Sequence, residues 1–115
     1  MNSGEQVARW IEQSFGLRDK DSFREEAAEY LYWLWEGRQQ FCYGCALGRA
    51  LAGKLGSFKK AAEVYDQESR GGMLGWVTMA RLLEIEVEFA KHIEILHCRY
   101  QDSRVVVKLL RGEGP

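Results

Sequence analysis

The 115-residue chain lacks several features that would assign it to a protein class at once. No apolar run approaches the roughly 18 residues that a membrane-spanning helix needs, and the N-terminus does not resemble a signal peptide. The three cysteines cannot all pair within one chain, so the sequence predicts free thiols. These absences favour a cytoplasmic or otherwise intracellular protein without a disulfide framework, and they exclude a membrane partner.

Catalytic side chains are also scarce. The chain has only two histidines, which leaves few general bases. No Ser-His-Asp or Cys-His order stands out, and no glycine-rich loop matches a P-loop or a dinucleotide fingerprint. The sequence therefore predicts a protein that is not an enzyme and that needs no cofactor.

Aromatic residues and segmental charge are what the chain does have. Four Trp, five Tyr and five Phe are many for this length, and some of them should lie at an interface. The net charge of −1 hides an acidic segment, residues 1–36, and a basic one, residues 37–70. Such a division is consistent with oppositely charged segments lying against each other, within one chain or between two.

The stretch from Met73 to Tyr100 dominates the predicted fold. It contains no proline and only one glycine, Gly75, and its apolar residues cover more than half of a helical circumference. We therefore expect one long central helix, about 73–100, that is packed on two or three sides, either by the rest of the chain or by another copy of it.

Shorter segments complete a mainly α-helical bundle in a single domain, 1–115. Helical spacing and capping residues predict helices near 4–15 after Ser3 or Asn2, from 21 or 22 to 36, across 38–55, and from Ser57 to about residue 70. Small residues between Gly44 and Gly53 predict a place where another helix crosses closely. Three consecutive valines favour a short C-terminal strand, about 104–110, which must pair with another segment or with its symmetry mate unless it is helical after all.

The function that these features favour is that of a non-enzymatic interaction or regulatory protein. The apolar surface of residues 30–35 wraps around the predicted second helix, which would place it in the centre or at an interface. Tryptophan and tyrosine are enriched among the residues that dominate binding energy. We therefore expect a homodimer that binds a protein partner through Tyr32, Trp33 and Trp35 and through the long helix.

A basic set with interleaved aromatics supports a nucleic-acid-binding alternative. Cationic side chains can follow a phosphate backbone while aromatic rings stack on bases, and a helical dimer could span successive grooves of duplex RNA by shape alone. The cationic residues of this set are Arg38, Arg49, Lys54, Lys59, Lys60 and Arg70.

A zinc site is another alternative. Cys42-x-x-Cys45 has the spacing of half a zinc site, and His97 with Cys98 could complete four ligands. Adjacent residues on a helix point about 100° apart, however, and rarely bind the same ion. The competing interpretation is that the three cysteines are small core residues.

One stretch resembles a known family. Gly56-Ser57-Phe58, Ala61-Ala62, Tyr65 and the run from Glu68 to Trp76, ESRGGMLGW, are similar to the middle of the parvulin peptidyl-prolyl isomerases, whose pattern runs F, A, YS, GGDLGW. The resemblance covers about twenty residues and does not include the family's first strand with its histidine. It implies an isomerase activity and a last strand at residues 105–110.

Overall fold

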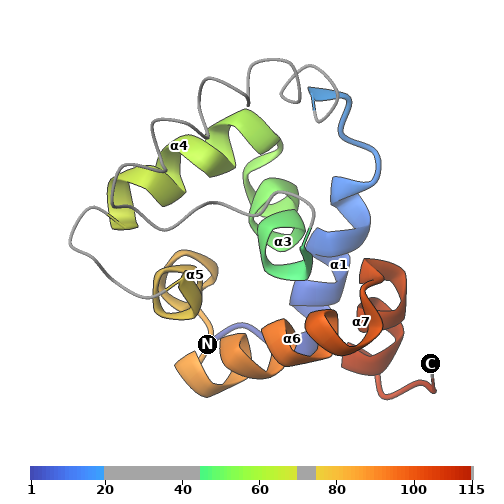
Figure 1. Cartoon of the computed structure of the whole chain (residues 1–115). Coiled ribbons are helices and arrows are strands. Elements are labelled where there is room, and N and C mark those ends of the chain that lie inside the picture. The colour runs from blue at the N-terminus through green and yellow to red at the C-terminus, as the bar shows by residue number, and fades with distance from the viewer. Residues whose placement is uncertain (20–44, 70–74, 115) are drawn as a thin grey trace.

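The computed structural model describes residues 1–19, 45–69 and 75–114, and within these ranges the regular structure is helical (Figure 1). The helices are α1 (Gly4–Ser14), α3 (Ala46–Leu55), α4 (Phe58–Ser69), α5 (Gly75–Leu83), α6 (Val87–Tyr100) and α7 (Ser103–Leu110). The prediction of a mainly α-helical chain is confirmed, and the buried apolar residues of these helices form one cluster. No helix within the three ranges combines the length and the apolarity needed to cross a membrane.

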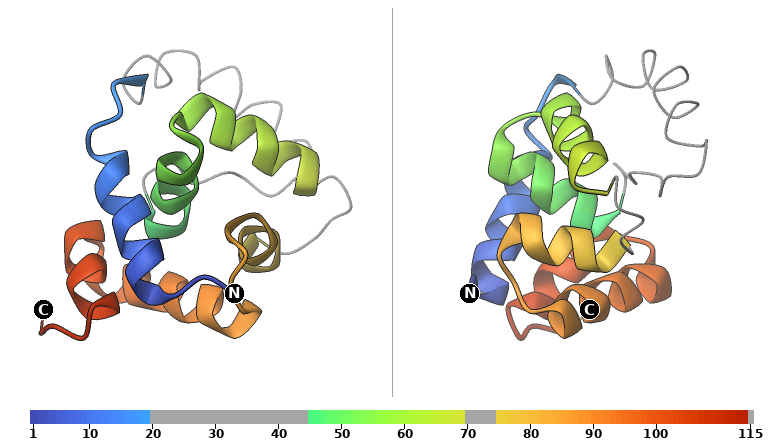
Figure 2. Two further views of the ribbon diagram at one scale, coloured as in Figure 1. Left: turned by 180° about the vertical axis from the view of Figure 1, so that it is seen from behind. Right: turned by 90° about the vertical axis from the view of Figure 1, so that its left-hand side faces the viewer.

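The helix at the centre is α3, and not the segment 73–100. It contacts α1, α4, α5 and α6, and Figure 2 shows these helices arranged around it. Its small residues allow this approach: a Cβ atom on Gly53 would lie only 1.8 Å from the carbonyl oxygen of Trp10 in α1. The predicted close crossing near Gly53 is therefore confirmed, while the predicted central helix is wrong.

The predicted long helix is also wrong in its continuity, because the chain turns sharply between α5 and α6. Glu84 has a left-handed φ of 55°. The N–H of Ile85 donates to the carbonyl of Ala80 at 3.0 Å, and the N–H of Glu84 donates to Arg81 at 3.3 Å. This pair of bonds is a Schellman motif, which ends a helix, here with glutamate in the place usually taken by glycine.

Side chains from distant parts of the chain stabilise this turn between α5 and α6, which we call the elbow. Lys54 Nζ donates to the carbonyl of Leu82 at 2.6 Å, and Asn2 binds the next two carbonyls through its side chain, to Leu83 at 3.0 Å, and its backbone N–H, to Glu84 at 2.8 Å. Carbonyl groups at a helix end need such partners. Ile85, directly after the turn, is buried. The break divides the apolar arc of the predicted helix 73–100 between α5 and α6.

The predicted strand at 104–110 is the helix α7, which also contradicts the last strand implied by the parvulin resemblance. Asp102 caps this helix by accepting from the N–H of Arg104 at 2.9 Å. Val106 and Val107 are buried, whereas Arg104 and Lys108 are exposed. Burial of one valine face outweighs the low helix propensity of valine, which costs about 0.5 kcal/mol per residue.

The beginnings of the remaining helices follow their capping residues. Ser3 caps α1 as predicted, since its hydroxyl accepts from the N–H of Gln6. The helix predicted from 38 to 55 does not run through Cys45, whose backbone is extended and whose sulfur accepts from the N–H of Gly48 at the start of α3. Residues 38–44 lie outside the described ranges.

The carboxylate of Asp19 caps α4. It accepts hydrogen bonds from Ser57 Oγ at 2.7 Å and from the N–H groups of Phe58 and Lys59 at 3.1 and 3.2 Å. Burial raises the pKa of this carboxyl, but these hydrogen bonds outweigh that effect and hold the pKa below its usual value. These hydrogen bonds link the segment that follows α1 to the first turn of α4.

Candidate functional site

Several residues predicted to be functional lie outside the described ranges. These are Tyr32, Trp33 and Trp35 of the predicted partner-binding site, Arg38 and Arg70 of the basic set, and Cys42 of the predicted zinc site. Their roles stay predictions.

The described members of the basic set are not gathered on one surface. Lys54 is engaged inside the fold: besides its bond to Leu82, its Nζ lies 3.8 Å from a carboxylate oxygen of Glu84 and 5.4 Å from the centre of the Trp10 ring. Lys59 and Lys60 are exposed in the first turn of α4. Arg49 lies instead over the ring of Phe15, at the end of α1. The arrangement gives Lys54 a structural role.

The described members of the predicted zinc site are also distributed. Cys45 caps α3, Cys98 is exposed on α6, and His97 is half-buried. Over residues 1–19, 45–69 and 75–114, no three His, Cys, Asp or Glu side chains are placed to hold one metal ion. His97 has a buried Nδ1 without a hydrogen-bond partner, and burial, followed by the charge of Arg49, lowers its pKa against an opposing effect of Asp102.

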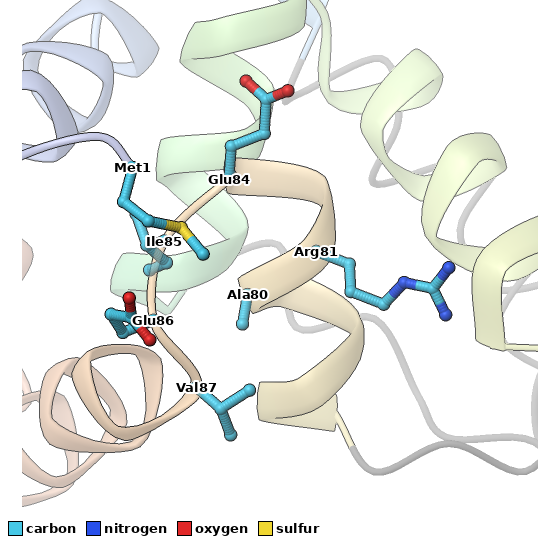
Figure 3. Close-up of a pocket in the computed structure, with 7 residues that line it drawn as sticks. All are labelled: Met1, Ala80, Arg81, Glu84, Ile85, Glu86 and Val87. Atoms are coloured by element: carbon cyan, nitrogen blue, oxygen red, sulfur yellow. The ribbon is translucent and has the colours of Figure 1, made fainter.

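A small apolar hollow lies beside the elbow between α5 and α6. Figure 3 shows Met1, Ile85, Val87 and Ala80 around it, with Arg81 pointing away. The hollow has a volume of about 360 Å³ and is bordered by the carboxylate-bearing residues Glu84 and Glu86. It is an open depression in which a partner's apolar side chain could rest.

The outer face of α6 carries exposed aliphatic side chains. Among its residues only Ala90 and Ile93 are fully buried, while Ile95 keeps 55% of its surface exposed and Val87 keeps 39%. The sequence arc included Val87 but not Ile95, because Ile95 lies on the opposite side of the helix from Ile93. Two large aliphatic side chains thus remain uncovered on one short helix.

Charged residues of both signs accompany Ile95. Glu88, Ile95 and Arg99 follow one another at intervals of seven and four residues, which places them in one stripe along the helix. We call these three residues the α6 stripe. Glu88 and Arg99 are exposed, and neither makes an ion pair within the described part of the chain.

Sequence reasoning also missed Arg104, because it placed this residue in a strand. Arg104 and Lys108 of α7 and its C-cap residue Arg111 follow one another at intervals of four and three residues and share one face. The sequence signal for this face is Asp102, because an aspartate N-cap predicts a helix that starts at the next residue.

Comparison of the chain with protein-family models, with curated proteins and with solved structures gives no match.

Proposed function

We propose that this chain is a non-enzymatic interaction protein that forms a homodimer by pairing the outer faces of two α6 helices. The observation that carries the proposal is the exposure of Ile95 between Glu88 and Arg99, two exposed charges of opposite sign that form no ion pair among the residues that the structure describes. An isologous dimer brings the same surface of both subunits together. A surface with an acid at one end, a base at the other and an aliphatic residue between them is complementary to itself.

The stripe sets the orientation of the pair. α6 has 14 residues and is therefore about 21 Å long. In an antiparallel pair, Glu88 near the start of one helix lies beside Arg99 near the end of the other, and the second such ion pair forms by symmetry. The two Ile95 side chains then lie next to each other close to the two-fold axis.

The energetics predict a weak dimer. Complete burial of an isoleucine side chain stabilises by about 1.5–3 kcal/mol, and each Ile95 has about half of its surface left to bury. Association itself costs about 4–15 kcal/mol in lost translational and rotational freedom. Flanking ion pairs contribute only about 0–1 kcal/mol each, and the smaller contacts around the stripe must supply the remainder. We therefore expect a weak dimer that forms only at high protein concentration.

A charge-exchange experiment tests the proposal. Glu88→Arg and Arg99→Glu should each weaken dimerisation, because each places two like charges beside one another in both halves of the pair. The double variant with both changes restores opposite charges and should dimerise like the wild type. Sedimentation equilibrium gives the association constants, and Ile95→Asp should give a monomer at every concentration.

Glu63→Arg on the exposed surface of α4 is the matched control, and it should leave the association constant unchanged. A wild-type protein that remains monomeric at about 1 mM, where even a weak dimer is populated, would refute the proposal. A double variant that associates no better than either single variant would refute the antiparallel pairing of Glu88 with Arg99.

Partner binding through Tyr32, Trp33 and Trp35 belongs to the same proposal. Their residue types support it, because binding hot spots are enriched in tryptophan and tyrosine. A homodimer would present two copies of such a surface, which increases the avidity for a repeated or dimeric partner.

A further inference from the structure

Two arginines share one exposed aromatic ring where α1, α3 and α7 meet. The guanidinium carbon of Arg49 lies 4.6 Å from the centre of the Phe15 ring, and that of Arg104 lies 4.7 Å from the same centre. Phe15 keeps 37% of its surface exposed. Arg49 also lies 5.9 Å from the centre of the Phe58 ring, so its guanidinium is positioned by two aromatic residues.

Stacking positions these guanidinium groups without using their hydrogen-bond donors. A guanidinium over a ring presents its flat face to the aromatic system, while its N–H groups point outward in its own plane. Neither Arg49 nor Arg104 donates a side-chain hydrogen bond or forms an ion pair within the described ranges. Within the described part of the chain, the donors of both guanidinium groups are therefore without a protein partner.

A hollow of about 440 Å³ lies beside Phe15 and Arg104, whereas Arg49 is not among the residues that line it. Phe15, Arg104, Val107 and Lys108 line it, together with Arg111, Glu12 and Glu113. Arg111 is bound by Glu5 and by Glu12, so the cations of the hollow without such partners are Arg104 and Lys108. Glu113 is the carboxylate at the rim that would oppose an anion.

Positive charge is in excess around the ring of Phe15. Burial and the neighbouring guanidinium of Arg104 lower the pKa of Arg49, against a smaller opposing effect of Cys45. Arginine nevertheless remains charged in proteins. Asp102, the N-cap of α7, directs its carboxylate to the backbone N–H of Arg104, from which it accepts a hydrogen bond. A bound anion would relieve the repulsion between the two guanidinium groups.

We propose that Arg104 and Lys108 form a binding site for a phosphate group, either free or carried by a small molecule, with Arg49 on the same Phe15 ring as a neighbouring positive charge. A guanidinium group matches the oxygen atoms of phosphate in a bidentate manner, and a dianion suits a site with two lining cations and a third nearby better than a monocarboxylate does. The apolar surfaces of Phe15 and Val107 would contact the organic part of a phosphate monoester. This site does not depend on the α6 stripe.

Titrations followed by NMR test the site, with inorganic phosphate, phenyl phosphate and acetate as probes at matched ionic strength. We expect saturable shifts of the Phe15 and Arg104 signals with phosphate, at a dissociation constant of about 1 mM, and with acetate only at concentrations at least tenfold higher. Tighter binding of phenyl phosphate than of phosphate would assign the natural ligand to phosphate monoesters. Equal binding would assign it to the free ion.

Variants of opposite sign complete the test. Arg104→Gln, at an exposed position, should weaken phosphate binding at least tenfold, since a charge-assisted hydrogen-bonded pair is lost. Glu113→Gln should strengthen it severalfold, and Arg81→Gln on α5 is the matched control that should leave it unchanged. Circular dichroism melting confirms that each variant is folded. Absence of saturable phosphate binding, or equal binding by wild type and Arg104→Gln, would overturn the proposal.

Discussion

The elbow at Glu84 predicts that glycine is more stable than alanine at position 84, whereas a continuous helix predicts the opposite order. In a straight helix through residue 84, alanine is more stable than glycine by about 1 kcal/mol. Glu84 has a φ of 55°, and a residue with a Cβ atom pays about 1–2 kcal/mol to adopt this conformation. Glu84→Gly should therefore be more stable than Glu84→Ala by about 1 kcal/mol.

Comparing the two variants with each other removes the other contributions of the side chain. Both lose the contact between Lys54 and Glu84, where the nitrogen and oxygen are 3.8 Å apart and the glutamate side chain is mostly exposed. Such surface pairs contribute about 0–1 kcal/mol, and this loss is the same in both variants. The difference between them therefore reports the backbone conformation.

Urea unfolding of both variants measures the difference as a change in midpoint at constant slope. In a domain of this size, about 1 kcal/mol corresponds to roughly 4 °C in melting temperature. Glu63→Gly and Glu63→Ala, at an exposed position within α4, provide the reference pair, for which alanine should be the more stable. Equal stability at position 84, or alanine ahead of glycine there too, would refute the elbow.

Two further predictions concern the packing of α1 and the start of α4. Gly53→Ala should destabilise the protein by about 3 kcal/mol or more, because the new methyl group meets the Trp10 carbonyl. Gly16→Ala is the control, since a methyl group at residue 16 has room. A loss of stability below about 1 kcal/mol for Gly53→Ala in urea unfolding would contradict the close crossing of α1 and α3. Asp19→Asn should cost about 1 kcal/mol at neutral pH. Because the folded pKa of Asp19 is lowered, its contribution is complete above the unfolded value of 3.8 and disappears as the pH falls through the folded pKa. Unfolding curves at several pH values should show a smaller acid-induced loss of stability in Asp19→Asn than in the wild type, and parallel losses would count against the cap.

Local signals in the sequence predicted the elements that local interactions determine. Ser3 and Ser57 mark the starts of α1 and α4 as expected, and Ser57 Oγ accepts from the N–H of Lys60 within the same turn. The small residues around Gly53 indicated the close crossing, because a missing side chain has one direct steric consequence. These predictions needed no knowledge of the rest of the chain.

The errors occurred where distant residues decide the structure. At the helix break at Glu84, Asn2 and Lys54 donate hydrogen bonds to the last carbonyls of α5, and no glycine or proline in the sequence marks the break. The helix α7 depends on burial of Val106 and Val107, which offsets a local preference for extended structure. The pairing of Arg49 with Arg104 around Phe15 could not be predicted for the same reason, since it requires α3 and α7 to meet the end of α1.

The elbow is also connected with the exposure of Ile95 on α6. A continuous rod over 73–100 would need cover over more than half of its circumference. By turning at Glu84, the chain packs α5 against α3 and α4 and packs α6 against α3, α5 and α7, so most of the arc is covered within one subunit. Ile95 falls outside both sets of contacts because it faces away from Ile93, the buried centre of α6. The turn fixes the direction in which α6 presents the face that carries Ile95. Glu84→Gly should therefore stabilise the elbow and leave the dimer association constant unchanged. A loss of both stability and dimerisation in Glu84→Gly would contradict this reasoning.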